Sequence, residues 1–507
     1  MRVENSLKNI STGLFGQLIT YILSFIVRTV FIITLGKTYL GVNGLFSNVL
    51  NVFSFAELGI GTAIVYNLYK PLADNDWEKI KAYINFYKKA YIRIGLIVLL
   101  IGAVFTPFLP YIIKENVSIP NITIIYLLFV LNSTIGYFFS YKFSIVTASQ
   151  KGYILTVAGY FFNVLSSVLQ LIILLTTKNY ILVLCMQVGI SFAQNWYFSY
   201  KATKLYPQLN YLKDAKLNKE ELQQIFKNVK ALVIYRIGGI LVSSTDNIII
   251  AMFVGVAFVG LYSNYLLLIA AVGTLLSIIF NSLTASIGNL NATEGNEKKY
   301  FMFRVVNLAN FWMYGFSSIF ILVTTSPFIK IWIGNDFVMS WEVVVVIALN
   351  VYLEGMLGAI WVYRETMGLF VYGRYRPLIS AAVNLIFSVV LVRKFGIVGV
   401  FIGTTITRVF TNAWFDPYIV FKHGFKLPVK GYYILYLKFL AIFIGTSSLV
   451  MVIVNKFFIF NNILNVIGIG ITSIVIPNII FFTIFRKTKE FQYLFNILKK
   501  IFNNIKR

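Results

Sequence analysis

The stretch LGKTYLG (residues 35–41) returns later in the chain as VGVAFVG (residues 254–260), with its two glycines at the same spacing. The tripeptide Thr-Pro-Phe at 106–108 returns as Ser-Pro-Phe at 326–328, at nearly the same offset along the chain. Matches that keep their order and nearly the same offset are typical of an internal repeat. The sequence therefore indicates two related halves.

A third match supports the duplication. Gly152 precedes Asn163 by the same distance in sequence as Gly373 precedes Asn384, and this pair recurs at nearly the same offset as the other two matches. One such match could arise by chance in so biased a composition, but three in order at one offset are not expected by chance. The first four fifths of the chain thus reads as two copies of one unit, and duplicated hydrophobic units are common in secondary transporters.

Composition decides the class of protein. Hydrophobic residues make up 58% of the 507 residues and charged residues only 12%, and the mean hydropathy is +0.79. A soluble protein carries about a quarter of its residues charged, so this chain is an integral membrane protein. Its apolar runs are long and do not alternate, whereas barrel strands alternate over about 10 residues. We therefore expect an all-α membrane protein.

Apolar runs of roughly 20 residues, the length that crosses the hydrocarbon core as a helix, predict about 14 transmembrane helices. We place them at about 9–35, 44–66, 90–113, 122–146, 154–176, 181–203, 229–254, 258–288, 303–327, 342–363, 377–393, 397–421, 434–455 and 462–484. The first twelve form the repeat, and the last two have no counterpart in it.

The repeat divides the chain into regions. Residues 1–203 form a first six-helix bundle and residues 229–421 a second, joined by a polar cytoplasmic linker at 204–228 that contains a short amphipathic helix. Since six is even, both bundles enter the membrane with the same orientation, which makes the repeat parallel. Two extra helices follow at 422–484, and the basic tail at 485–507 has the spacing of an interfacial helix or serves only to fix topology.

Lys and Arg are distributed unequally between the two sides of the predicted membrane. With the N-terminus in the cytoplasm, about 33 of the 44 Lys and Arg fall in inside segments and about 7 in outside loops, as the positive-inside rule requires. We therefore expect both termini in the cytoplasm. The net charge of +26 then faces anionic membrane lipids, and no nucleic-acid partner is needed to explain it.

Catalytic and metal sites are not indicated. Cys185 and His423 are the only cysteine and histidine, so neither a disulfide nor a Cys/His metal site can form within one chain. The run GKT at 36–38 resembles the end of a phosphate-binding loop, but Phe31 stands where that loop requires glycine. We expect no enzyme and no resident cofactor. Transport energy would come from a Na⁺ or H⁺ gradient, the membrane potential or the gradient of the substrate.

Ionisable side chains inside the spans are the candidate site residues. Each costs about 2.5–3.5 kcal/mol on insertion scales and persists mainly where it faces a cavity or a partner. The candidates are Arg28, Glu57, Lys142, Arg236, Asp246, Glu354, Arg408 and Asp416. The repeat aligns Arg28 with Asn247, next to Asp246, so these two charges could pair across a cavity. A structural salt bridge that never touches substrate is the other interpretation of the pair.

The remaining candidates differ in depth. Lys142 and Asp416 lie near the cytoplasmic end, where a lysine can reach the interface, and we favour a structural role for both. Three of the four basic candidates are arginines, whose planar guanidinium matches the oxygens of a phosphate. The cavity is therefore expected to be cationic.

Several motifs together resemble a known family. They are Arg28 with LGKTYLG at 35–41, AELGIG at 56–61 leading to YKPL at 69–72, ASQK at 148–151, DNIII at 246–250 and VGLYSNY at 259–265. Over essentially the whole chain, the sequence resembles the Wzx-type polysaccharide-unit flippases, in the superfamily that also contains the multidrug and toxin extruders (MATE) and the lipid II flippases.

This resemblance implies a MATE-like, V-shaped pair of six-helix bundles around a cavity that opens alternately to each side. It implies a flippase in the bacterial cytoplasmic membrane that moves an undecaprenyl-diphosphate-linked oligosaccharide, a precursor of capsule, O-antigen or exopolysaccharide, to the outer leaflet. Other polysaccharide-assembly membrane proteins are then possible partners. The implied cavity residues are Arg28, Arg236 and Arg408 for the diphosphate, Glu57, Asp246 and Glu354 for charge balance or a coupling ion, and Asn264.

Three other functions remain open. A cation-coupled multidrug extruder would use the same fold but would need acidic groups to dominate the cavity, and here arginines are at least as numerous. Export of lipid II or of a teichoic-acid precursor is a second alternative. A membrane scaffold for glycan assembly that transports nothing is a third, for which the basic linker and tail offer docking surfaces.

Overall fold

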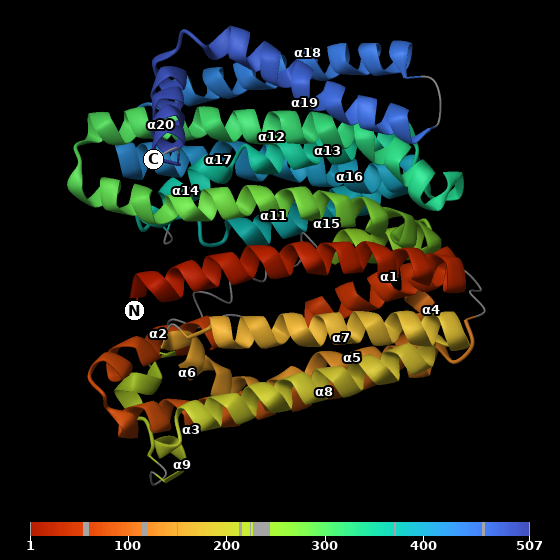
Figure 1. Cartoon of the computed structure of the whole chain (residues 1–507), viewed down its shortest axis with the longest axis vertical. Helices are drawn as coiled ribbons and strands as arrows, with labels where there is room; N and C mark the ends of the chain where they lie inside the picture. Colours follow the sequence, from red (N-terminus) through yellow and green to blue (C-terminus); the bar gives the residue numbers. More distant parts are fainter. Residues whose placement is uncertain are drawn as a thin grey trace. The chain divides into compact units, whose positions relative to one another are not determined.

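The computed structural model is built from long α-helices that lie side by side within each of two compact units (Figure 1). It describes residues 2–53, 60–113, 119–149, 151–211, 215–223, 225–226, 244–369, 372–458 and 462–505. The units are Met1–Gly260 and Leu261–Arg507. The boundary between them falls at the end of the second copy of the glycine motif, residues 254–260. The division into bundles at 204–228 rests on the hydropathy pattern and stays a prediction.

The described helices before this copy of the motif belong to the first unit. They are α1 (Arg2–Phe53), α2 (Ile60–Ala73), α3 (Trp77–Val104), η2 (Thr106–Phe108), α4 (Leu109–Ile112), α5 (Ile122–Ile135), η3 (Gly136–Phe138), η4 (Ser140–Lys142), α6 (Phe143–Ala148), α7 (Tyr153–Thr177), α8 (Tyr180–Leu205) and α9 (Gln208–Tyr211). Residues 244–253 are also helical.

Helix α11 begins in the first unit and continues into the second, which holds all later helices. They are α11 (Val256–Thr293), α12 (Asn296–Ile333), η5 (Asn335–Phe337), α13 (Trp341–Gly355), α14 (Gly358–Thr366), α15 (Arg376–Phe395), α16 (Ile397–Thr407), η6 (Arg408–Asn412), α17 (Ala413–Ile419), η7 (Val420–Phe425), α18 (Lys430–Phe457), α19 (Ile463–Phe485) and α20 (Lys489–Ile505).

Among the described residues, 11 helices are long and apolar enough to cross a membrane, which confirms a multi-pass all-α protein. The other three of the 14 predicted spans have simple explanations. The span at 44–66 is partly continuous with α1, and most of the span at 229–254 lies outside the described residues. The span at 397–421 is helical but is interrupted by the π-helical turn η6. About 14 helices therefore fit this fold.

The first glycine of each repeated motif has a positive φ angle. Gly36 has φ 82° and Gly255 has φ 141°, a region that favours glycine because it lacks a Cβ atom. Within the described helix α1, Gly36 is also the one interior position that leaves helical geometry. Both copies of the motif thus place glycine where the backbone takes a positive φ angle.

The second glycine of each motif makes a close backbone contact with the other motif. A Cβ atom built on Gly41 would lie 1.9 Å from the carbonyl oxygen of Val256, and one built on Gly260 would lie 2.4 Å from that of Lys37. The repeat makes Lys37 equivalent to Val256 and Gly41 equivalent to Gly260. The two contacts are therefore reciprocal, since each joins a glycine of one motif to the carbonyl group of the equivalent position in the other.

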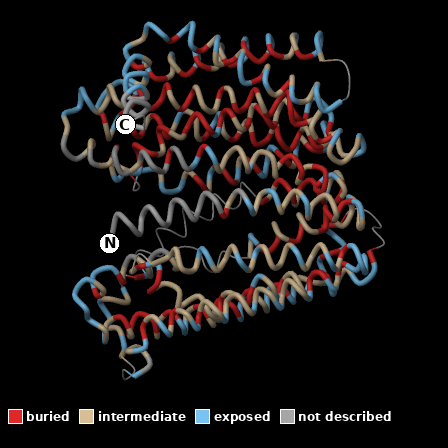
Figure 2. Tube along the Cα trace, in the orientation of Figure 1, coloured by how far each residue is buried: buried red, intermediate tan, exposed pale blue. Residues whose placement is uncertain are grey.

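Burial follows the requirements of a lipid environment. Buried residues gather inside each unit, and many outward positions are exposed (Figure 2). The exposed positions include large apolar side chains on the membrane helices, such as Leu100 on α3, Ile386 on α15 and Val452 on α18. Apolar side chains on the outside are stable where the surrounding solvent is hydrocarbon.

The linker docks on the first unit through a capped helical turn. The Glu221 N–H donates to the Asn218 side chain (2.8 Å), and the Asn218 N–H donates to the Glu221 carboxylate (3.1 Å), which is a capping box. The Lys79 ammonium of α3 lies 2.7 Å from the Glu221 carboxylate and donates a hydrogen bond that holds the pKa of Glu221 below its ordinary value. The expected linker helix is thus present over the residues described there.

The tail forms helix α20, which runs transverse to the other helices of its unit (Figure 1). Phe491 stacks on Trp312 of α12, and Glu490 pairs with Arg304 of the same helix. The tail is thus helical and packs on α12; its position at the membrane interface stays a prediction.

Candidate functional site

Two of the predicted cavity residues, Glu354 and Arg408, lie together in the second unit where two helices are interrupted. Helix α13 ends at Gly355 and α14 begins at Gly358. Helix α16 ends at Thr407, and the chain continues as a π-helical turn that starts with Arg408. π-Helical turns inside α-helices are often found at functional sites.

The two side chains form an ion pair. The Arg408 Nη2 atom lies 2.6 Å from the Glu354 Oε2 atom, and Arg408 Nη1 also donates to the backbone carbonyl of Asn350. The Arg408 side chain is 17% exposed and the Glu354 side chain 56% exposed. The guanidinium is therefore held by a backbone carbonyl as well as by its carboxylate partner, and the carboxylate is the more exposed of the two groups.

The break between α13 and α14 is built by small residues and one asparagine. The Asn310 side-chain amide of α12 donates to the Gly355 carbonyl (2.9 Å), which satisfies a backbone group that the interrupted helix leaves open. A Cβ atom at Gly355 would lie 2.0 Å from the Tyr314 ring, and one at Gly358 would lie 2.7 Å from the Asn310 oxygen. Glycine is needed at both ends of the break.

Asn350 joins the two interrupted helices. Its side-chain amide donates to the Phe401 carbonyl of α16 (2.9 Å), and the Thr405 hydroxyl donates to its side-chain oxygen (3.2 Å). Together with the bond from Arg408 to its backbone carbonyl, these contacts fix the position of the guanidinium relative to α13.

A second cluster of charged side chains is buried, and the sequence did not predict that its members lie together. Arg364 Nη1 and Arg376 Nε lie 2.5 and 3.3 Å from the same Asp416 oxygen, and the Trp361 N–H donates to the other oxygen (3.1 Å). The Asp416 side chain is 0% exposed and the Arg364 side chain 6%. Arg364 also donates to the Tyr372 carbonyl (2.6 Å).

This arrangement agrees with a structural role for Asp416. Its two arginines were missed because they lie near the ends of predicted spans, where basic residues usually set topology. Their nearness to Asp416 could not be inferred from spacing alone. The aspartate itself, placed among apolar residues, was the sequence signal that a partner had to exist.

The other predicted site residues lie as follows. Arg28 is half-buried on α1, Asp246 is buried in the helical residues 244–253, and Asn264 is buried on α11. Glu57 and Arg236 lie outside the described residues. The pairing of Arg28 with Asp246, and the part that each of these residues plays in binding, stay predictions.

The remaining candidate, Lys142, donates to the Thr203 hydroxyl (3.2 Å). In the part of the chain that the structure describes, no group of three or more His, Cys, Asp or Glu side chains is placed to hold a metal ion.

Comparisons with known proteins identify the fold. No family model and no curated protein sequence matches this chain. Among solved structures it is similar to a multidrug resistance MATE family transporter of the MOP superfamily in an inward-facing conformation, with a TM-score of 0.65 and 12% identity over 79% of this chain and 94% of that one.

Two further structures show the same likeness. The lipid II flippase MurJ, in an inward closed conformation, has a TM-score of 0.62 and 14% identity over 94% of this chain and 99% of MurJ. A mutant of the Vibrio cholerae MATE transporter VcmN has a TM-score of 0.53 and 15% identity over 84% of this chain and 99% of VcmN. The chain therefore has the fold that these two MATE transporters and this lipid II flippase share.

Proposed function

We propose that this protein is a flippase that moves an undecaprenyl-diphosphate-linked oligosaccharide repeat unit from the inner to the outer leaflet of the bacterial cytoplasmic membrane by alternating access. Both termini would lie in the cytoplasm. The lipid-linked substrate, the membrane lipids and other polysaccharide-assembly proteins would be its partners.

The extent of the structural match supports the choice of a lipid-linked substrate. The match to the MATE transporter covers 79% of this chain, and the match to MurJ covers 94%. The twelve repeated helices end near residue 421 of the 507, so the match to MurJ must include part of the segment that follows them, which holds α18, α19 and α20. A fold extended beyond the repeat is thus shared with the neighbour that is a lipid II flippase.

The proposed substrate carries a charged diphosphate across the membrane, and basic groups inside the spans are suited to bind it. An unpaired charge cannot be buried in hydrocarbon without a cost of many kcal/mol, so a diphosphate with sugars needs a hydrated, basic path. Arg408 offers a guanidinium on a π-helical turn, and its partner Glu354 is 56% exposed. In this proposal the carboxylate neutralises the guanidinium when no substrate is bound, and a diphosphate replaces it.

The multidrug-extruder alternative predicts the opposite selectivity. A cationic drug would bind Glu354 and be repelled by Arg408, whereas a diphosphate would bind Arg408 and be repelled by Glu354. Native mass spectrometry of the purified protein in nanodiscs, with undecaprenyl diphosphate, the same lipid carrying an oligosaccharide, and a cationic drug as separate probes, distinguishes the two functions.

We expect Arg408→Gln to weaken retention of undecaprenyl diphosphate at least tenfold, because a hydrogen bond to a charged group is worth about 1.5–3 kcal/mol. Glu354→Gln should strengthen retention, since it removes the competing carboxylate. Arg374→Gln serves as the matched control, because Arg374 is an exposed arginine of the same unit. Equal retention by Arg408→Gln and Arg374→Gln would remove Arg408 from the site.

Arg28→Ala tests the first unit in the same way. We expect it to abolish flipping of a fluorescent lipid-linked oligosaccharide in proteoliposomes while the protein still inserts into the membrane, because a guanidinium inside a span is suited to the diphosphate. Insertion is checked by the yield of monodisperse protein. Flipping at the original rate would show that Arg28 has only a structural role.

A further inference from the structure

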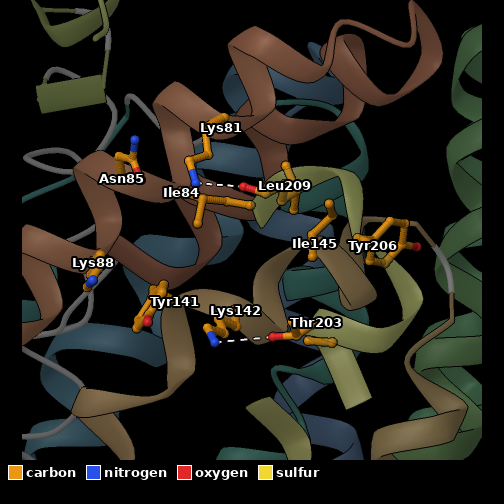
Figure 3. Close-up of a pocket in the computed structure, with 11 residues that line it drawn as sticks. Lys81, Ile84, Asn85, Lys88, Tyr141, Lys142, Ile145, Thr203, Tyr206 and Leu209 are labelled. Atoms are coloured by element: carbon orange, nitrogen blue, oxygen red, sulfur yellow. Dashed lines mark hydrogen bonds between the residues drawn. The ribbon is translucent and has the colours of Figure 1, made fainter. Parts of the chain in front are cut away.

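A pocket in the first unit is lined by three lysines that the proposed transport path does not use. Lys81 and Lys88 come from α3 and Lys142 from η4, and Asn85, Tyr141 and Thr203 complete its polar lining (Figure 3). We call it the lysine pocket. Its volume is about 220 Å³, several times the roughly 30 Å³ that one water molecule occupies in the liquid.

The sequence of α3 creates this arrangement. Positions 81, 85 and 88 are spaced by four and three residues, so they share one face of the helix. Helix α3 contacts η4, which contributes Lys142, and η4 in turn contacts α8, which contributes Thr203 to the same pocket. Three segments that are distant in the sequence thus bring their polar groups to one place.

The charges in the lysine pocket are all of one sign. None of the described residues that line it is Asp or Glu, and Lys81 and Lys88 both repel the Lys142 ammonium. Lys81 Nζ donates to the Leu209 carbonyl (2.6 Å) and Lys142 Nζ to the Thr203 hydroxyl (3.2 Å). An ammonium has three donors, so each of these lysines keeps donors for a ligand after these bonds.

The depth of the pocket places it near the outer limit of the lipid headgroups. Helix α3 has 28 residues, about 42 Å at 1.5 Å per residue, which exceeds the roughly 30 Å hydrocarbon core. Its uninterrupted apolar stretch begins at Ile94, after Arg93. Lys88 therefore lies about 9 Å before the hydrocarbon, close to the outer limit of the headgroup layer, which extends about 5–8 Å beyond the hydrocarbon on each side. Lys81 lies farther out, on the aqueous side of the headgroups.

We propose that the lysine pocket binds the phosphate group of a membrane lipid. The lysines supply positive charge, Asn85, Tyr141 and Thr203 supply neutral hydrogen-bonding groups, and the lipid chains remain in the bilayer beside α3. This site belongs to the first unit alone. It does not depend on the proposed transport activity, since any lipid phosphate of the cytoplasmic leaflet satisfies its chemistry.

The test measures lipid affinity by native mass spectrometry of the full-length protein in detergent. The probes are phosphatidylglycerol, undecaprenyl diphosphate and, as a phosphate-free lipid, diacylglycerol. Each lysine near a lipid surface contributes about 1 kcal/mol, so we expect Lys88→Met to weaken binding of a phosphate lipid roughly fivefold and the variant with all three lysines changed to Met roughly a hundredfold.

Matched controls separate the pocket from general positive charge. Lys89→Met removes the neighbouring exposed lysine of α3, which does not line the pocket, and Lys88→Arg keeps the charge. Both should bind phosphate lipids within twofold of the original protein. Because Lys88 is exposed, we expect Lys88→Met to fold. This single variant therefore tests the site even if the triple variant fails to fold.

The outcomes divide clearly. Tighter binding of either phosphate lipid than of diacylglycerol, lost in Lys88→Met and kept in Lys89→Met, supports the site and identifies which lipid supplies the phosphate. Equal affinity in Lys88→Met and Lys89→Met overturns it, as does equal binding of diacylglycerol. Displacement of the lipids by inorganic phosphate at the same concentration would assign the pocket to free phosphate and overturn the lipid assignment.

Discussion

Gly41→Ala and Gly260→Ala should each lower the thermal unfolding midpoint of the detergent-purified protein. The decrease should exceed that caused by the same substitution at a glycine with open surroundings. The added Cβ atom would lie 1.9 Å from the Val256 carbonyl oxygen in the first variant and 2.4 Å from the Lys37 carbonyl oxygen in the second. Overpacking costs about 1–3 kcal/mol where side chains can move. Here the obstacle is backbone, so we expect a cost at or above the top of that range.

A glycine on α11, the helix that also holds Gly260, provides the control. Gly273 lies on α11 and has nothing within 4 Å of the position of a Cβ atom. Gly273→Ala should therefore leave the midpoint unchanged or raise it, since alanine is favoured over glycine in a helix by about 1 kcal/mol. A midpoint for Gly41→Ala no lower than that of Gly273→Ala would mean that the two glycine motifs do not touch in solution.

The reciprocity of the contact gives a sharper test. Both glycines lie at one interface between the two motifs, so a small separation of the motifs relieves both clashes at once. We expect the double variant Gly41→Ala/Gly260→Ala to lose much less stability than the sum of the two single variants, because substitutions that share a contact are not additive. Additive losses would place the two glycines in independent environments.

The repeat predicted which residues are equivalent, but not which surfaces meet. The repeat aligns Gly36 with Gly255, and the structure adds that both have positive φ angles. Gly41 contacts Val256, the residue that the repeat makes equivalent to Lys37. This contact depends on the tertiary structure. A single sequence contains no signal for it, because glycine spacing is compatible with a turn, a kink or a close approach.

Hydropathy predicted the spans and missed their interruptions. The span at 397–421 appears as a continuous apolar run, yet it contains a π-helical turn at Arg408–Asn412. A change in the hydrogen-bonding pattern of one turn leaves the composition unchanged, so hydropathy cannot detect it. Arg408 and Glu354 were found individually because charge inside a span is conspicuous. Their pairing could not be found, because α14, α15 and α16 separate them in the sequence.

Asp416→Asn should destabilise the protein far more than Glu354→Gln, although both substitutions remove a carboxylate from an arginine. The two ion pairs have nearly equal lengths, 2.5 Å for Arg364 with Asp416 and 2.6 Å for Arg408 with Glu354. They differ in burial, because the Asp416 side chain is 0% exposed and the Glu354 side chain 56%. Breaking a fully buried pair costs about 3–5 kcal/mol because the remaining charge is left uncompensated, and this cost is smaller where one partner is largely exposed.

The cost of Asp416→Asn comes from the arginines that remain. Arg364 and Arg376 would stay in a buried site with no carboxylate between them, and their side chains are only 6% and 10% exposed, against 17% for Arg408. The double variant Arg364→Met/Asp416→Asn removes one of these uncompensated charges, so its unfolding midpoint should lie above that of Asp416→Asn alone. If the double variant is instead the less stable, packing and hydrogen bonds from Arg364, including the 2.6 Å bond to the Tyr372 carbonyl, outweigh charge burial. Equal midpoints for Asp416→Asn and Glu354→Gln would contradict the role assigned to burial itself.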